Sequence, residues 1–156
     1  MNDKLFDAIR NGDLEMVKAI TTAHPELVNI KDQRGSTPLL LASYFGNQDI
    51  TEVLLTLNPD LDAKDGSGNT ALMGVCFKGY PVIAKLLIDH GADVNAVNLN
   101  NATALIYAAT FAQAEIAQLL VNNGANIAHK DDKDNTAYDH AKMQGAKELM
   151  AILNEE

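Results

Sequence analysis

The sequence predicts an all-α fold built from stacked repeats, and three observations support this prediction. Threonine recurs every 33 residues, at Thr37, Thr70, Thr103 and Thr136. A small residue recurs with the same period, in the series Ala42, Val75, Ala108 and Ala141. Leucine or isoleucine recurs in two further series, Ile50, Ile83, Ile116, Leu149 and Leu54, Leu87, Leu120, Leu153. A period of about 20 to 50 residues is typical of solenoids, in which each repeat buries its apolar face against its neighbours.

Each repeat is expected to begin with a short helix, as residues 38–45 illustrate. The Thr37 hydroxyl can accept hydrogen bonds from the free N–H groups of the first turn, and Pro38 suits the first helical position. Gly46 is expected to end this helix in a left-handed conformation. The equivalent positions later in the chain hold Gly79, Ala112 and Gly145. Because Ala tolerates a left-handed backbone poorly, we expect a less relaxed helix end at Ala112.

A second helix is expected over residues 48–57, because Ile50, Val53, Leu54 and Leu57 fall on one helical face. Asn58 and Pro59 should end it, since Asn tolerates a left-handed cap and Pro cannot continue a helix. An extended segment then leads into a tight turn, and the four turn positions hold Gly35, Gly68, Asn101 and Asp134. These residue types favour turns with a positive φ, so a hairpin should project from each repeat.

The stretches Asp65–Leu72 (DGSGNTAL) and Leu86–Ala96 (LLIDHGADVNA) resemble the ankyrin repeat. The resemblance covers essentially the whole chain and implies an ankyrin solenoid of helix-turn-helix units with projecting β-hairpin loops. We expect one domain with five units, at residues 1–31, 32–64, 65–97, 98–130 and 131–156. The family usually has a His that ties neighbouring hairpins, whereas this chain has Leu40, Met73, Ile106 and Asp139 there. More apolar or looser hairpin contacts are therefore expected.

Composition and charge exclude several classes of function. The chain has 12 basic and 21 acidic residues and a net charge of −9, and no cluster of Lys and Arg that could bind nucleic acid. The acidic balance mildly favours a basic partner. No apolar run is long enough to cross a membrane, and no signal peptide is recognisable. With Cys76 as the single cysteine, the expected location is cytoplasmic, although a signal segment could have been removed.

Nothing in the sequence indicates catalysis. The four histidines fall at unrelated places in the repeats, with no i, i+4 pair, so neither a metal nor a cofactor is expected. Cys76 lies inside a predicted helix, where a small buried apolar role is favoured over a nucleophilic one. No nucleophile elbow and no phosphate-binding glycine loop is present. The chain is therefore predicted not to be an enzyme.

Gly74 and Tyr107 occupy equivalent places in consecutive repeats, where Leu41 stands one repeat earlier. One interpretation is that the Tyr107 ring fills interior space that Gly74 leaves empty, so that Gly74→Leu would overpack the interior. The other interpretation is that Gly74 only weakens its helix.

In ankyrin proteins the partner usually lies across the hairpin tips and the ends of the first helices, which form a concave face. Carried over to this chain, the candidate protein-binding residues are Gln33, Arg34, Ser36, Tyr44, Phe45, Ser67, Asn69, Phe77, Lys78, Leu99, Asn100, Thr110, Phe111, Asp132 and Lys133. Four of the eight aromatic residues are in this set. They could form an exposed binding surface, or they could fold under the neighbouring hairpins as core.

The resemblance implies a non-enzymatic protein–protein interaction module, expected to be monomeric and to bind a partner through its concave face. The small stand-alone form is similar to bacterial ankyrin repeat proteins. Two classes of function stay open. The chain could be an adaptor or scaffold for several partners, or a dedicated inhibitor or immunity protein that blocks one enzyme or toxin.

Overall fold

The computed structural model describes residues 1–154, which form ten α-helices, one 3₁₀ helix and no β-strand. The helices are α1 (Asn2–Arg10), α2 (Leu14–Ala23), η1 (Pro25–Asn29), α3 (Pro38–Tyr44), α4 (Gln48–Leu55), α5 (Ala71–Lys78), α6 (Pro81–Asp89), α7 (Ala104–Thr110), α8 (Ala114–Asn122), α9 (Ala137–Gln144) and α10 (Lys147–Leu153). One pair of α-helices falls in each of the five predicted units. The unit boundaries themselves stay a prediction, and residues 155–156 of the last unit lie outside the described residues.

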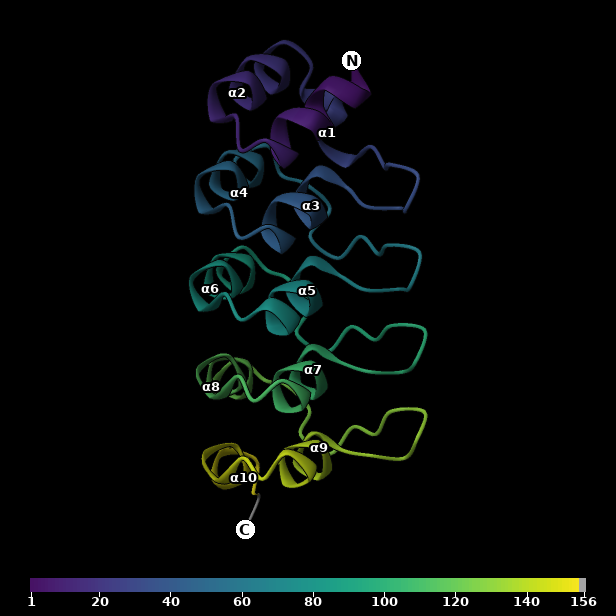
Figure 1. The fold of residues 1–156 in the computed structure, drawn as a ribbon, viewed down its shortest axis with the longest axis vertical. Helices are drawn as coiled ribbons and strands as arrows, with labels where there is room; N and C mark the ends of the chain where they lie inside the picture. The colour runs from purple at the N-terminus through teal and green to yellow at the C-terminus, as the bar shows by residue number, and fades with distance from the viewer. Residues whose placement is uncertain (155–156) are drawn as a thin grey trace.

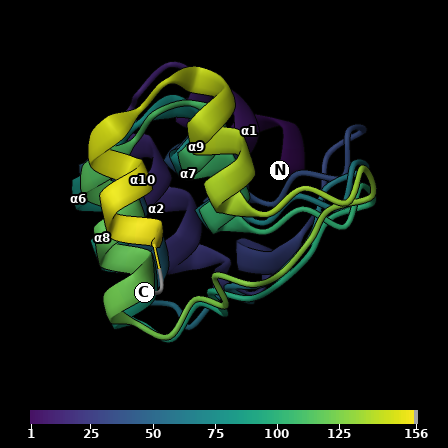
Figure 2. The ribbon, with the colours of Figure 1, turned by 90° about the horizontal axis from the view of Figure 1, so that it is seen from below.

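The helices stack in two columns (Figure 1). The odd-numbered helices form one column and the even-numbered helices form the other, with α1 and α10 at opposite ends of the stack. Each odd-numbered helix packs against the next odd-numbered helix and against the even-numbered helix of its own pair. Seen along the stack, the loops project together on the side of the odd-numbered helices (Figure 2). The prediction of an all-α solenoid is confirmed.

The predicted helix starts are present. The hydroxyl of Thr37 accepts a hydrogen bond from Leu40 N at 3.2 Å, and the three equivalent threonines cap α5, α7 and α9 in the same way. The last of them forms a full capping box, because Thr136 N also donates to Asp139 Oδ2 at 2.9 Å. Thr37 is buried, so this capping satisfies backbone N–H groups that water reaches poorly.

The predicted left-handed positions are also present. Ala112 has a φ of 56° where the other repeats have glycine, and Asn58 has a φ of 51° at the end of the second helix pair. α4 ends at Leu55, two residues before the predicted end. The reason is local: Leu57 N donates to Leu54 O in a tighter turn that leads into Asn58.

The core runs along the middle of the stack, between the two columns. Ala42, Val75, Ala108 and Ala141 are all fully buried in the odd-numbered helices. The leucines of the even-numbered helices meet them from the other side, and Leu87 is fully buried at the centre. Cys76 is buried as predicted, and its burial raises the pKa of the thiol far above its ordinary value. A thiol in this state is an inert packing group.

The projecting loops are hairpins held by turn hydrogen bonds and by their neighbours. In the first of them, Asp32 Oδ1 accepts hydrogen bonds from Arg34 N and Ser36 N, each at 2.9 Å. The next hairpin is joined to it because Gly66 N donates to Arg34 O at 3.1 Å. The later pairs are joined in the same way, by Leu99 N to Ser67 O and Asp132 N to Asn100 O. At the place of the family's usual His, the side chains of Leu40, Met73 and Ile106 are buried in the apolar core.

A second set of inter-repeat hydrogen bonds links the loops that follow the even-numbered helices. Asn29 Oδ1 accepts from Asp60 N, Asp62 Oδ1 from Asp93 N, and Asn95 Oδ1 from Asn126 N, each at 2.8 Å. These side chains recur at the repeat period, but the sequence analysis did not single them out. Together with the hairpin bonds, they connect successive repeats along the segments that join each helix pair to the next.

The central position of Leu87 gives a prediction for stability. Leu87→Ala should lower the free energy of unfolding by about 2–5 kcal/mol, because a cavity opens in a core that collapses only partly. Urea unfolding followed by circular dichroism measures the change. Leu99→Ala is the matched control, since Leu99 is 73% exposed at a hairpin tip and should change stability by less than about 0.5 kcal/mol. Equal effects of the two substitutions would contradict the assigned core.

A substitution at Ala112 is predicted to raise the free energy of unfolding. Ala112→Gly should raise the free energy of unfolding by about 1 kcal/mol, because glycine adopts the φ of 56° without the steric cost that Ala carries. Ala151→Gly is the control, because Ala151 is an exposed position within α10 and its replacement should cost about 1 kcal/mol. A loss of stability in both variants would show that Ala112 is not strained.

Candidate functional site

A groove of about 1210 Å³ lies between the hairpin loops and the odd-numbered helices, and extends from α1 to α7. Nine of the fifteen predicted binding residues line it. These are Gln33, Arg34, Ser36, Tyr44, Phe45, Ser67, Asn69, Phe77 and Phe111. The hairpins supply the polar side of the groove and the helices supply its aromatic side. We call this surface the aromatic groove.

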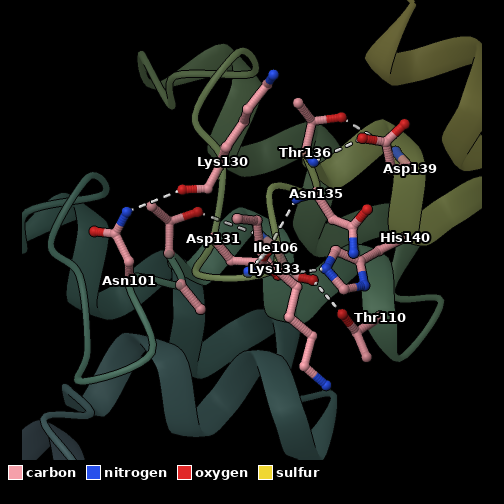
Figure 3. Close-up of polar contacts among 12 residues, drawn as sticks. Asn101, Ile106, Thr110, Lys130, Asp131, Lys133, Asn135, Thr136, Asp139 and His140 are labelled. Atoms are coloured by element: carbon pink, nitrogen blue, oxygen red, sulfur yellow. Dashed lines mark hydrogen bonds and ion pairs between the residues drawn. The ribbon is translucent and has the colours of Figure 1, made fainter.

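The other six predicted residues lie outside the aromatic groove. They are Lys78, Leu99, Asn100, Thr110, Asp132 and Lys133. Leu99 is exposed at the tip of its hairpin. The Thr110 hydroxyl is occupied within its own helix, where it donates to Ile106 O at 2.7 Å (Figure 3). The structure therefore gathers the candidates of the second and third units, apart from Lys78, and leaves out those of the last two units, apart from Phe111.

The aromatic side chains form a continuous row across three helices. The rings of Tyr44 and Phe77 are stacked with centroids 6.3 Å apart and an interplanar angle of 5°. Phe77 meets Phe111 edge to face at 4.7 Å. Phe45 lies 6.2 Å from Tyr44 at one end, and Tyr107 lies 6.2 Å from Phe111 at the other. Offset-stacked and edge-to-face geometries stabilise such a row, so its rings hold one another in place.

These rings are not core. The exposed fractions are 40% for Tyr44, 49% for Phe45, 42% for Phe77 and 40% for Phe111. The interpretation that they fold under neighbouring hairpins as core is therefore wrong. Each ring rests on its neighbour and leaves a large apolar area open to solvent along one face of the stack.

Sequence reasoning missed several groove residues. Phe6, Arg10, Leu41, Gly74 and Tyr107 all line the aromatic groove. Three of them, Leu41, Gly74 and Tyr107, recur at an interval of 33 residues. This spacing could have identified them, because it places the series on the same surface as Tyr44 and Phe77.

The proposed packing of Tyr107 against Gly74 is wrong. A Cβ atom placed on Gly74 would meet only Tyr44 Cδ1 at 3.5 Å, and no atom of Tyr107 within 4 Å. The Tyr107 hydroxyl instead reaches the hairpins, where it accepts from Asn98 Nδ2 at 3.0 Å and donates to Asn69 Oδ1 at 3.4 Å. The space beside Gly74 is part of the groove and not of the interior.

The last hairpin is tied to its helix by an ionisable pair (Figure 3). His140 Nε2 lies 2.7 Å from Asp131 Oδ2, and Asp131 Oδ1 accepts hydrogen bonds from Lys133 N and Asn135 N, each at 3.0 Å. Partial burial opposes ionisation of Asp131. The hydrogen bonds from His140, Asn135 and Lys133 outweigh that opposition, so the pKa of Asp131 lies below its ordinary value of 3.8.

Two further findings concern residues 1–154. No three His, Cys, Asp or Glu side chains in this range gather closely enough to hold a metal ion. Nor does any helix in it combine the length and the apolar character that a membrane span requires.

The lowered pKa of Asp131 predicts how stability depends on pH. Asp131→Asn keeps the turn, because Asn98 makes the same turn bonds one repeat earlier, and it removes the charge beside His140. Wild type should be more stable by roughly 1 kcal/mol near pH 5. The carboxylate's contribution is present above pH 3.8 and is lost as the pH falls through the lower folded pKa. The difference should therefore shrink between about pH 5 and about pH 2 in urea unfolding. A difference that stays constant would contradict the pairing.

Comparison with known proteins places these repeats in a family. Over 58 residues, which make up 37% of this chain, the sequence is 33% identical to the mouse (Mus musculus) ankyrin repeat and SAM domain-containing protein 6. The chain spans 7% of the length of that relative, so the likeness concerns a stretch of repeats and not the whole protein.

Two family models match the chain. The model described as ankyrin repeats (3 copies) matches residues 5–98, and the model described as ankyrin repeats (many copies) matches residues 78–141. Ankyrin repeats generally mediate protein–protein interactions and form non-enzymatic interaction modules. The first match alone covers more than half of the 156 residues. The chain belongs to the ankyrin repeat family.

Proposed function

We propose that this chain is a non-enzymatic module that binds a protein partner through the aromatic groove. The observation that carries the proposal is the row of four partly exposed rings, Tyr44, Phe45, Phe77 and Phe111, held against one another along a single groove. Aromatic side chains bury a large apolar area and lose few rotamers on binding, so they dominate the energetics of protein interfaces. A row of this kind is suited to the centre of an interface.

The groove is also preorganised. Its hairpins are fixed by turn bonds such as those of Asp32 and by the inter-hairpin bond from Gly66 N to Arg34 O. Each ring of the row contacts a neighbouring ring, which restricts its motion. Because little has to be ordered when the partner arrives, most of the gain from burial contributes to affinity.

Charge supports a basic partner. The net charge of −9 attracts a basic protein over a distance and disfavours nucleic acid. Charge complementarity of this kind speeds association and orients the partner. Cys76 is the single cysteine, and it is buried and free, which fits a monomer in a reducing compartment such as the cytoplasm.

The test is an affinity capture of the natural partner, with wild type compared with the variant Tyr44→Ala/Phe45→Ala/Phe77→Ala/Phe111→Ala. The four rings are partly exposed, so the variant should keep its fold while binding falls by about 100-fold or more. The control variant Met16→Ala/Val82→Ala removes two exposed apolar side chains outside the groove and should bind as wild type does. Binding is measured by calorimetry with the captured protein.

Three results are informative. One stoichiometric partner that depends on the four rings supports a dedicated inhibitor or immunity protein, and several substoichiometric partners support an adaptor. Partners that bind the folded four-ring variant unchanged would show that the aromatic groove is not the binding surface.

A further inference from the structure

Each hairpin begins with an Asp or Asn whose Oδ1 atom accepts two backbone hydrogen bonds of the turn. These residues are Asp32, Asp65, Asn98 and Asp131. In three of the four, the remaining side-chain atom has a partner on a helix. Arg10 Nη2 lies 3.6 Å from Asp32 Oδ2, Asn98 Nδ2 donates to the Tyr107 hydroxyl at 3.0 Å, and His140 Nε2 lies 2.7 Å from Asp131 Oδ2. The hairpin bases are thus normally closed by a side chain of the same molecule.

Asp65 is the exception. The helical position that holds Tyr107 and His140 in the later repeats is Gly74, which has no side chain to offer. Within residues 1–154, no hydrogen bond or ion pair reaches Asp65 Oδ2. Every buried side-chain oxygen or nitrogen in that range has a partner, so this unpartnered oxygen is open to solvent. One hairpin base therefore presents a free carboxylate oxygen.

The free carboxylate belongs to the aromatic groove. Asp65 and Gly74 both line it, together with Tyr44 and Phe77. Tyr44 Cδ1 lies 3.5 Å from the point where a Cβ of residue 74 would stand, so the missing side chain leaves a notch beside the Tyr44 ring. The notch thus combines one carboxylate oxygen with aromatic rings at the centre of the row.

A guanidinium group is the chemistry that suits such a notch. It donates to a carboxylate and stacks on an aromatic face, and it loses less hydration than an ammonium when it is buried. The molecule contains its own example one repeat earlier. Arg10 lies 3.6 Å from Asp32 Oδ2 and 6.0 Å from the centroid of the Phe6 ring, so a guanidinium there meets a hairpin Asp and an aromatic ring together. Cations also approach the row itself, since Lys78 Nζ lies 5.1 Å from the Tyr44 centroid.

We propose that the aromatic groove takes one arginine side chain of its protein partner into the notch beside Gly74, with the guanidinium on Asp65 and against the rings of Tyr44 and Phe77. This inference rests on the proposed function and deepens it. The rings supply affinity for a partner surface, and the notch selects partners that present an arginine at the matching point.

The chain itself suggests the variants. Asp65→Asn removes the charge and keeps the turn, because Asn98 makes the same two turn bonds in the next repeat. Gly74→Tyr fills the notch as Tyr107 does in that repeat, and a Cβ at residue 74 meets only ordinary contact. Asp49→Asn is the matched control, since it removes one acidic charge from an exposed residue of α4 outside the groove.

The probe is a library of random peptides displayed on phage and selected on wild type. The selected peptides should share one arginine. In synthetic peptides, replacing that arginine by the neutral isostere citrulline should weaken binding at least about tenfold. Asp65→Asn and Gly74→Tyr should weaken the arginine peptide by a similar factor, and on these variants the arginine and citrulline peptides should bind alike. Asp49→Asn should change the dissociation constant by less than about twofold.

The opposite results separate this inference from the proposed function. Peptides that share no arginine, or that keep their affinity on folded Asp65→Asn, overturn the arginine notch. If those same peptides lose binding to the four-ring variant, the aromatic groove as a binding surface is still supported. Peptides that are insensitive to the four-ring variant count against the groove itself, and a wild-type chain that selects no peptide overturns the notch.

Discussion

Close packing of the odd-numbered helices is the constraint on which the rest of the structure depends. The column of Ala42, Val75, Ala108 and Ala141 is fully buried in the core of the stack, where a larger side chain would overpack the interior. Because successive odd-numbered helices pack against one another with the same position buried each time, every repeat stands in the same register as the one before it. This register allows a bond made in one repeat, such as that from Leu40 N to the Thr37 hydroxyl, to recur through the stack.

The same register creates the aromatic groove. Val75 and Cys76 point into the core, whereas Gly74 and Phe77, on the same helix, line the groove. Since neighbouring helices repeat this arrangement, groove positions from three helices come to lie side by side and their rings touch, as Phe77 and Phe111 do at 4.7 Å. No single helix carries an aromatic surface of its own. The surface exists only because the stack aligns residues that are distant in the sequence.

A feature could be predicted from the sequence when the residues that determine it are neighbours in the chain. The threonine caps and the left-handed residue at Asn58 depend on a few neighbouring residues, and they were predicted correctly. The exposure of Tyr44 depends on how far the next hairpin reaches over it, so the sequence left two interpretations open. The partners of the Tyr107 hydroxyl, Asn98 and Asn69, lie on the hairpins of two repeats, so no pattern within one repeat predicts them.

Constant and variable positions of the repeat carry different information. A core position such as Ala108 is confined to small residues by the helix on either side of it. The position held by Leu41, Gly74 and Tyr107 lines the groove and has solvent on one side, and its series continues with His140 outside the groove, so this position can vary without loss of the stack. Each of these side chains changes what the adjacent hairpin base presents: a closed pair at Asn98 and at Asp131, and an open carboxylate at Asp65. The repeated residues therefore specify the fold, and the departures from the repeat specify the shape and the chemistry of the groove.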